Sequence, residues 1–426
     1  MYQPQSLPWS EPLALAGAVD EPYWVLLYSG VQAGYSGRYS YLACDLAERI
    51  EGDDFALLEK RLSSDTGPFD NAWFGTLGYG LKNRLETLES DRPNWLSLPD
   101  LCMMRFHTIY QFDHEQRTLT RWSDRPEAAI LQEKPIPAIY PPGVTSLRSP
   151  MPRAEYLEKA ADIIESIHRG DLYQANLTRK FIGGFESVPD YFALFCRLCA
   201  ISPAPYSAFM RLGAHALLSS SPELFLHSDA QGHMRTRPIK GTAPRSDDSA
   251  TDQKSRDTLA VSRKDRAENL MIADLMRNDL SRSCIPGSVK TESLFEVTTH
   301  AAIHHMSSTV TGQKRPGCST LEAVKHCFPP GSMTGAPKIT AMNLCSRLEG
   351  LQRGVYSGAL GWFGGDGSCE LSVVIRTLLL KGRDFEFQVG GGIVADSTPQ
   401  GECQEIIDKS KAMLKTLGVS VDDFDT

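Results

Sequence analysis

Residues 354–394 read GVYSGALGWFGGDGSCELSVVIRTLLLKGRDFEFQVGGGIV, and their pattern of apolar runs and turns sets the fold class. The runs at 354–363, 369–380 and 385–394 are rich in β-branched, aromatic and leucine residues and predict three strands. The links GGDG and KGRD are typical of tight turns, so the strands form antiparallel hairpins. Because helical patterns flank these hairpins, we expect an α+β fold and not a doubly wound parallel sheet.

The segments before these hairpins alternate between helix and strand patterns. Apolar residues at helical spacing in 153–170 predict a helix that stops at Gly170. Residues 171–181, DLYQANLTRKF, alternate as a strand does, with Gln174 and Asn176 on one face. Further predictions are a hairpin over Gly213 and Ala214, helical structure over 247–280, a helix pair around 328–338 and a last helix over about 400–417.

A proline-dense stretch, 131–152, predicts a linker between two parts of the chain. The part before it is rich in short strand-like pieces such as 23–30 and 71–80. The length of 426 residues is enough for two or three domains. We therefore expect an N-terminal α+β subdomain over 1–148 and a second, larger domain over 149–426.

The composition excludes several classes of function. The chain is 41% hydrophobic and 23% charged, as in ordinary globular proteins. Its net charge of −8, without a basic stripe, argues against a nucleic-acid partner. No apolar run reaches about 18 residues and the first residues lack a signal-peptide pattern, so we expect no membrane span and a cytoplasmic location. Ten scattered cysteines suit a reducing compartment and do not form a zinc motif.

Three carboxylates stand out by their context. Glu268 lies in RAENLMIADLMRNDL, and Glu402 and Glu405 lie in TPQGECQEIIDKSKA. Their i, i+3 spacing places Glu402 and Glu405 on one face of a helix that Thr398 or Ser397 can cap. Hard oxygen ligands of this kind suit Mg²⁺. The alternative is that acids near a helix N-terminus only complement the helix dipole.

Several groups nearby could bind an anion. Consecutive glycines in VGGGIV (389–394) let backbone N–H groups approach an anion closely, although no dinucleotide-binding fingerprint is present. Arg376 is a charge within an apolar strand pattern; it either caps a strand end or binds a carboxylate through two N–H groups. Lys409 either meets a substrate anion or pairs with Glu405. The histidines of THAAIHHMSSTV (299–310) lack an HExxH arrangement, and we expect most of them to be structural.

A lysine and a glutamate complete the candidates. Lys240 lies in RPIKGTAPR (237–245), and Glu223 follows a proline in SSSPELFL, seventeen residues earlier. A hairpin between them would bring the acid and the amine together as a proton donor and a nucleophile. Without that pairing, Lys240 is a solvated surface lysine and Glu223 an ordinary turn acid.

Ten of these segments, in this order, resemble the chorismate-utilising enzymes. The resemblance covers roughly 150–415, with a weaker echo in SGRYSYLA (36–43). Its blocks are GDLYQANLTR, SSSPELF, RPIKGTAPR, AENLMIADLMRNDL, HMSSTV, FPPGSMTGAPK, YSGALGW, IRT, GGGIV and GECQEIIDKSKA. It implies two antiparallel β-sheets packed face to face with helices on the outside, and a chorismate-binding catalytic domain over 149–426.

Two positions sort the branches of the family. The isochorismate and salicylate synthases carry a water-activating lysine where this chain has Gln174, which argues against water as the incoming nucleophile. Anthranilate synthases read Pro-Ile-Ala-Gly-Thr where this chain reads PIKGT, and a lysine there marks the aminodeoxychorismate synthase branch. The resemblance thus implies that Lys240 is a covalent nucleophile and Glu223 a proton donor. The alternatives are an anthranilate synthase component and a chorismate-binding subunit without catalysis.

The resemblance also implies the remaining roles. Glu268 and Glu405, with Glu402 beside them, would hold Mg²⁺ against the ring carboxylate of chorismate. The substrate-binding residues would be Gly241, Thr242, His305, Tyr356, Arg376, Gly390, Gly391, Gly392, Lys409 and Gln174. The product would be 4-amino-4-deoxychorismate, a precursor of 4-aminobenzoate and folate. Because the chain has no Gly-x-Cys-x-Gly glutaminase elbow, we expect ammonia to come from a separate glutamine amidotransferase subunit. The Leu-Leu-Glu-Ser element of tryptophan-sensitive relatives is not visible, so strong tryptophan inhibition is not expected.

Overall fold

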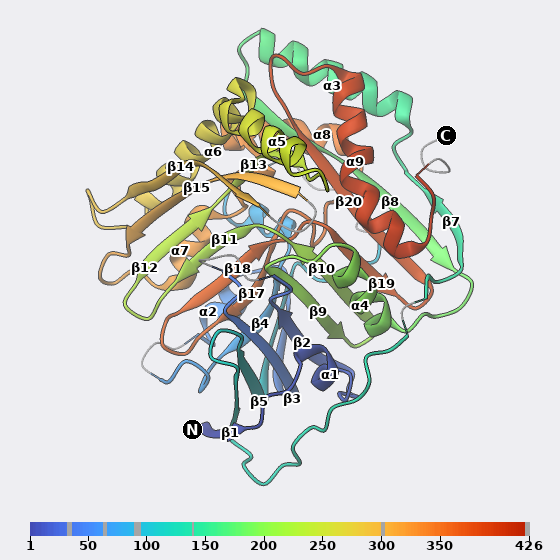
Figure 1. Cartoon of the computed structure of the whole chain (residues 1–426). Coiled ribbons are helices and arrows are strands. Elements are labelled where there is room, and N and C mark those ends of the chain that lie inside the picture. The colour runs from blue at the N-terminus through green and yellow to red at the C-terminus, as the bar shows by residue number, and fades with distance from the viewer. Residues whose placement is uncertain (32–35, 63–65, 89–94, 139, 300–302, 422–426) are drawn as a thin grey trace.

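The computed structural model describes residues 1–31, 36–62, 66–88, 95–138, 140–299 and 303–421 (Figure 1). The strands are β1 (Gln3–Leu7), β2 (Tyr23–Tyr28), β3 (Tyr39–Gly52), β4 (Trp73–Leu77), β5 (Leu101–Asp113), β6 (Thr118–Ser123), β7 (Val144–Arg148), β8 (Gln174–Phe185), β9 (Tyr206–Leu212), β10 (His215–Ser221), β11 (Leu224–Ser228), β12 (His233–Arg237), β13 (Ile239–Pro244), β14 (Lys290–Thr299), β15 (Ile303–Gln313), β16 (Gly335–Ala336), β17 (Ala359–Phe363), β18 (Cys369–Val373), β19 (Thr377–Lys381) and β20 (Asp384–Ile393). The helices are α1 (Pro12–Ala16), α2 (Ala56–Glu59), α3 (Arg153–His168), α4 (Tyr191–Ile201), α5 (Ser249–Val261), α6 (Arg263–Ser281), α7 (Thr320–Cys327), α8 (Lys338–Glu349) and α9 (Pro399–Leu417), with short 3₁₀ turns η1 (Tyr79–Arg84) and η2 (Gly331–Met333).

The strands form one hydrogen-bonded antiparallel network that divides at β5. From one edge of β5 the order runs β3, β2, β9, β10, β19, β20 and β8, which we call the first limb. From the other edge it runs β4, β17, β18, β11, β12 and β15, which we call the second limb. β14 and β13 extend the second limb, and β7 and β16 pair with β8.

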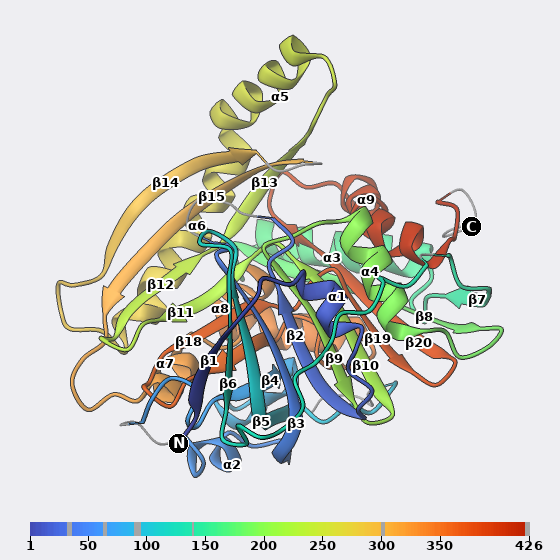
Figure 2. The ribbon, with the colours of Figure 1, turned by 60° about the horizontal axis from the view of Figure 1, so that its bottom comes forward.

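The limbs pack face to face, and helices cover their outer faces (Figures 1 and 2). The core between the limbs contains residues of both, among them Val25 and Met210 of the first and Phe74 of the second. A second core lies between the first limb and α3, α4, α8 and α9, and a third lies between the second limb and α6 and α7. The sequence WFGTL of β4 fits this position, because Trp73 faces the outer core while Phe74 faces the inner one. The α+β fold with two opposed antiparallel sheets is therefore confirmed.

Several local predictions are also confirmed. The helix over 153–170 is α3, which ends at His168 just before Gly170 at φ +86°. β9 and β10 form the hairpin over 213–214. Helix α9 begins as expected, with the Thr398 hydroxyl accepting a hydrogen bond from the Gly401 N–H at 3.2 Å. The helical stretch 247–280 is divided at Ser262, whose side chain caps α6.

Two predictions differ from the structure. The run 369–380 is not one strand: β18 belongs to the second limb and β19 to the first, and the chain bends between them at Arg376, which has φ +49°. The proline-dense stretch 131–152 is not only a linker, because it contains β7, which pairs with β8. The division into 1–148 and 149–426 stays a prediction, although strands from both parts pair with each other, as β2 with β9 and β4 with β17.

The described residues include no helix that is both long and apolar enough to cross a membrane. The ten cysteines are free and buried in the cores.

Candidate active site

The candidate site lies where the chain passes from one limb to the other. Glu223 links β10 of the first limb to β11 of the second, and Arg376 links β18 of the second limb to β19 of the first. Backbone hydrogen bonds hold these links beside each other, since the Val373 N–H donates to the Glu223 carbonyl at 3.0 Å and the Ser220 N–H to the Arg376 carbonyl at 3.1 Å. The two limbs diverge at these links, and a cavity with polar groups at its edge lies between them.

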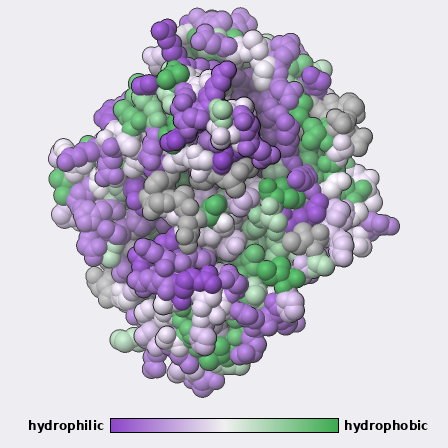
Figure 3. Space-filling model, in the orientation of Figure 1, coloured by the Kyte–Doolittle hydropathy of each residue, from purple (hydrophilic) through white to green (hydrophobic). Residues whose placement is uncertain are grey.

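This cavity has a volume of about 500 Å³ and brings most of the predicted residues together. Those lining it are Glu223, Lys240, Gly241, Thr242, Glu268, His305, Tyr356, Arg376, Gly390, Gly392, Glu405 and Lys409. Three predicted residues, Gln174, Gly391 and Glu402, lie in the wall behind this lining. The molecular face in Figure 3 is mostly hydrophilic, with small separate hydrophobic patches.

The hairpin of β11 and β12 brings the predicted acid and amine to the same end of the cavity. Leu224 pairs with Arg237 at the open end of this hairpin. Glu223 precedes Leu224 and Lys240 follows Arg237, so both lie beyond that open end. The Lys240 amine lies against β20, where a Cβ atom on Gly392 would be 3.0 Å from its Nζ. A Cβ atom there would be still closer to Gln174 Nε2, at 2.5 Å, so a side chain at position 392 would crowd both polar groups.

Burial shifts the pKa values of both groups toward their neutral forms. Burial lowers the pKa of the Lys240 amine, and the Lys409 ammonium lowers it further, while Glu268, Glu223 and Glu405 act in the opposite sense. Burial raises the pKa of the Glu223 carboxyl, against the effects of a hydrogen bond from Ser332 and of the Lys240 charge. Each group thus moves toward the protonation state that a proton donor or a nucleophilic amine needs.

Of the three predicted carboxylates, Glu402 and Glu405 lie beside the glycines of β20, and Glu268 is near enough to Glu405 for their charges to interact. A Cβ atom on Gly391 would lie 2.8 Å from Glu402 Oε2 and 3.6 Å from Glu405 Oε1. Ser397 donates to Glu402 Oε1 at 2.6 Å, whereas Glu402 Oε2 is buried without a hydrogen-bond partner among the described residues. Burial and the Glu405 charge raise the pKa of Glu402. A buried carboxylate oxygen without a donor is a position where a cation would be favourable.

Two lysine side chains form ion pairs with Glu405 and Glu268. Lys409 Nζ lies 2.6 Å from Glu405 Oε1, and Lys264 Nζ lies 3.9 Å from Glu268 Oε1. Burial raises the pKa of Glu405, but the Lys409 ammonium outweighs it and the net pKa is below the usual value. Across the described ranges, no three His, Cys, Asp or Glu side chains form a ready cluster of metal ligands. The oxygen donors fit Mg²⁺ in kind, and binding would require the lysines to move.

The opposite wall is suited to a carboxylate. Arg376 is half-buried at the limb crossing, and the Gly390 N–H donates to the Tyr356 phenol oxygen. Within β20, only residues 384–387 pair with β19. The same edge of β20 is therefore open at Gly390 and Gly392, where it faces the cavity. Lys409 Nζ donates to the Gly390 carbonyl at 3.0 Å. A guanidinium, a phenol and open backbone groups therefore meet on one side.

Strand β8 adds uncharged polar groups. Gln174 has no exposed surface, and neither atom of its amide group has a hydrogen-bond partner in the part of the chain that the structure describes. Its Nε2 would be 2.5 Å from a Cβ atom on Gly392, so it lies next to the Lys240 amine. Asn176 lines the cavity, and its Nδ2 is buried and likewise unpartnered within the described residues. The alternation of β8 places both on the predicted polar face.

Some residues that line the cavity were not predicted, and the two described histidines of 299–310 differ, since His305 lines the cavity and His304 does not. Asn176, Lys264, Asp265 and Ser332 line the cavity without having been assigned to the site. The alternation that singled out Gln174 could have found Asn176, and Ser332 lies in the quoted block FPPGSMTGAPK. The buried His304 side chain contacts Asp252 Oδ1 at 3.1 Å, away from the cavity, and His300 lies outside the described residues.

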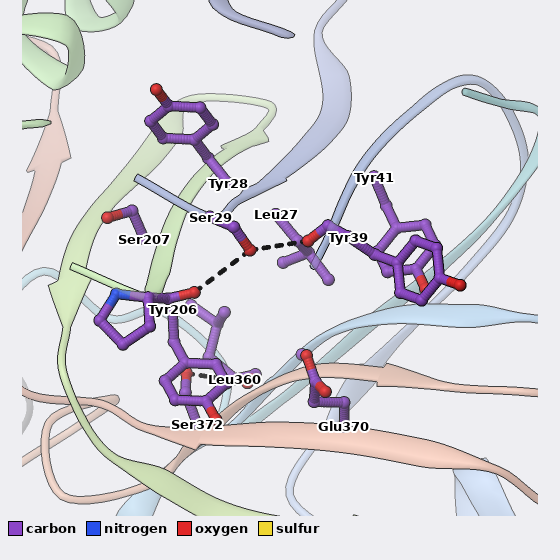
Figure 4. Close-up of a pocket in the computed structure, with 12 residues that line it drawn as sticks. Leu27, Tyr28, Ser29, Tyr39, Tyr41, Tyr206, Ser207, Leu360, Glu370 and Ser372 are labelled. Carbon is purple, nitrogen blue, oxygen red and sulfur yellow. Dashed lines mark hydrogen bonds between the residues drawn. The ribbon is translucent and has the colours of Figure 1, made fainter. Parts of the chain in front are cut away.

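A second, much smaller void of about 30 Å³ lies between the limbs (Figure 4). Tyr28, Tyr39, Tyr41 and Tyr206 surround it, together with Glu370. The hydroxyl of Ser29 donates to the carbonyl of Tyr39 at 2.7 Å and closes one side. This space holds about one water molecule.

Comparisons with known proteins agree with this geometry. The family described as chorismate binding enzyme matches residues 28–415. Aminodeoxychorismate synthase component 1 of Salmonella typhimurium is 39% identical over 354 residues, covering 82% of this chain and 77% of the relative. The Escherichia coli protein of the same name is 38% identical, with 82% and 78% covered. Anthranilate synthase component 1 of Streptomyces coelicolor is 33% identical, with 91% and 82% covered.

Solved structures with the same fold are more distant in sequence. Anthranilate synthase component I from Streptococcus pneumoniae superposes with a TM-score of 0.77 at 24% identity, covering 95% of this chain and 97% of that one. The menaquinone-specific isochorismate synthase from Escherichia coli superposes with a TM-score of 0.81 at 16% identity, covering 98% and 94%. The fold, the cavity and these matches agree, and the chain belongs to the chorismate-binding enzyme family.

Proposed function

We propose that the chain is component 1 of an aminodeoxychorismate synthase, which converts chorismate and ammonia to 4-amino-4-deoxychorismate and water. The observation that carries the proposal is the Lys240 amine inside the cavity, beside Gly392 and at the same end as Glu223. The relatives from Salmonella typhimurium and Escherichia coli that carry this name support it.

The reaction follows from the acid and the amine. The neutral Lys240 amine attacks C2 of the ring, the ring double bond shifts, and the C4 hydroxyl leaves as water with a proton from Glu223. Ammonia then attacks C4, the double bond shifts back, and the C2–N bond breaks. The electron pair of that bond returns to Lys240 and a proton of the new C4 ammonium returns to Glu223, so the amine and the acid are both regenerated.

The pair needs only one proton in total to be active. A protonated Glu223 beside a neutral Lys240 carries the same number of protons as the ion pair of the two. Burial disfavours separated charges, and it shifts both pKa values toward the neutral pair. The cavity therefore favours the reactive form of two groups that would be ionised in water.

The remaining walls bind and orient the substrate. Arg376, Tyr356 and the open edge of β20 at Gly390 and Gly392 bind the enolpyruvyl carboxylate, while Gly241, Thr242 and His305 line the ring pocket. Glu268, Glu405 and Glu402 would hold Mg²⁺, which neutralises and orients the ring carboxylate when bound. Ammonia would come from a glutamine amidotransferase partner, and free ammonium should replace it in vitro.

A product assay tests the proposal. The purified chain is incubated with chorismate, Mg²⁺ and ammonium, and the products are identified by mass spectrometry. Formation of 4-amino-4-deoxychorismate without release of pyruvate is the expected result. Pyruvate together with a fluorescent aromatic amine would instead identify an anthranilate synthase, the function of the 33% identical Streptomyces coelicolor relative. Binding of chorismate without turnover would indicate a non-catalytic subunit.

A further inference from the structure

Arg353 and Glu349 form a buried ion pair directly behind the cavity. The Arg353 guanidinium binds Glu349 through two contacts, Nε to Oε2 at 2.8 Å and Nη2 to Oε1 at 2.6 Å. The exposed fractions of the two side chains are 1% and 5%. Neither residue lines the cavity, so the pair does not meet substrate. A buried ion pair is costly to desolvate and is weak evidence for a stability role alone.

The other N–H groups of Arg353 reach three segments that line the cavity. Nη2 donates to the carbonyl of Asn176 at 2.7 Å, and Nη1 donates to the carbonyl of Met333 at 2.7 Å and to the hydroxyl of Ser357 at 3.2 Å. With the two bonds to Glu349, all five N–H donors of the guanidinium are used. No lysine could reproduce these contacts, because its ammonium has only three donors.

Each of these segments carries a group of the site. Asn176 lies on β8, where the Thr178 N–H also donates to Glu349 Oε1 at 3.1 Å. Arg353 and Glu349 therefore both hold β8. Met333 follows Ser332, whose hydroxyl donates to the Glu223 carboxyl. Ser357, at φ +67°, follows Tyr356. The pair also lies under the N-terminal part of the chain, since the guanidinium carbon is 4.5 Å from the ring centroid of Tyr79.

We propose that the Arg353–Glu349 pair is a positioning device for the proton donor: it fixes η2 and β8, and through Ser332 it holds the Glu223 carboxyl toward the departing hydroxyl. The inference rests on the proposed function. Misplacement of a catalytic group by about 1 Å can lower a rate about 100-fold. Within the carboxylate-binding wall, Arg376 is held separately, because its carbonyl accepts a bond from the Ser220 N–H at 3.1 Å, so turnover should suffer more than substrate affinity.

The test compares Glu349→Gln with a matched control. Glu386→Gln removes a carboxylate from another buried ion pair, in which Lys180 Nζ of β8 lies 3.2 Å from Glu386 Oε1 of β20, outside the cavity. We expect Glu349→Gln to lower kcat about 10- to 100-fold with KM for chorismate changed less than about threefold. Glu386→Gln should lower the melting temperature similarly and leave kcat near that of the wild type.

A double-variant cycle separates positioning from general loosening. If Arg353 acts through Ser332, Glu349→Gln should lower kcat by a much smaller factor in the Ser332→Ala background than in the wild-type chain. Effects that multiply in the double variant, or an effect of Glu349→Gln no larger than that of Glu386→Gln, would overturn the proposal. If Glu349→Gln does not fold, Ser357→Ala removes one of the five bonds and takes its place in the same cycle. A wild-type chain that makes no product would refute the proposed function instead.

Discussion

The two cavities between the limbs differ in what surrounds them, although both lie between the same two sheets. The larger one, about 500 Å³, lies where the chain crosses between limbs and is lined by lysines, glutamates, an arginine and open backbone. The smaller one, about 30 Å³, lies at the ends of β2, β3 and β9 against β17 and β18, and tyrosine rings surround it. Sheets packed face to face close on apolar and aromatic side chains. Of these two cavities, the one at the crossing points combines a large volume with charged side chains.

This difference predicts that the lysine in the large cavity is costly to the fold and essential to the chemistry. Lys240→Met should abolish formation of 4-amino-4-deoxychorismate and should raise the melting temperature. Burial lowers the pKa of Lys240, so the unfolded chain binds more protons than the folded chain between the lowered pKa and the ordinary value near 10.5. Wild-type stability should thus rise with pH across that window.

Each unit by which the pKa of Lys240 is lowered corresponds to about 1.4 kcal/mol. Because methionine has no proton to bind, the variant should lose this pH dependence of stability. Product assays and thermal unfolding at several pH values measure both effects. A variant that still forms product at the wild-type rate would show that Lys240 is not the nucleophile.

The second prediction concerns Glu223 and the pH profile. Activity needs one proton on the Glu223–Lys240 pair, so kcat/KM should be bell-shaped, with apparent pKa values that belong to the pair. Protonation of Lys240 lowers the rate on the acidic side, and loss of the Glu223 proton lowers it on the alkaline side. Glu223→Gln should lower the rate about 10²- to 10⁴-fold and remove the alkaline limb. An alkaline limb that persists in this variant would assign it to another group.

How far the sequence predicts this arrangement depends on the range of the contacts involved. The caps and periodicity of α3 and α9 are local, so their positions and the shared face of Glu402 and Glu405 follow from the sequence. The bend at Arg376 does not, because VVIRTLLL is one continuous apolar run. Its division depends on which strands β18 and β19 pair with, and those partners lie in different limbs. The assignment of Lys240 to catalysis came from the family resemblance.

The missed residues have the same cause. Asn176 and Ser332 are short polar side chains in segments with other evident roles, a strand and a proline-rich turn. They become part of the site only because η2 and β8 are brought behind Glu223 by long-range contacts such as those of Arg353. No spacing within the sequence encodes that contact. For the same reason, β7 could not be found within a proline-dense stretch, since it exists by pairing with β8.

The third prediction concerns the cations that now neutralise the large cavity. Lys264 lies 3.9 Å from Glu268 and is half exposed, so it competes weakly with an incoming Mg²⁺. Lys264→Met should tighten Mg²⁺ binding a few-fold, measured by calorimetry on the chain without substrate. Lys254→Met, on the exposed α5, is the matched control and should leave the affinity unchanged. Weaker binding in Lys264→Met would show that Lys264 assists the metal site and does not compete with it.

The smallest effect is expected at the small cavity, and it should appear in stability alone. Ser29 donates to the Tyr39 carbonyl at 2.7 Å and closes one side of this void. Ser29→Ala removes that bond, which should lower the free energy of unfolding by about 1 kcal/mol and leave kcat and KM unchanged. Addition of tryptophan should not change the rate either, because the tyrosine rings leave a space of only about 30 Å³. A loss of turnover in Ser29→Ala at full folding would mean that the two cavities are coupled, and that the tyrosine-lined region regulates the charged one.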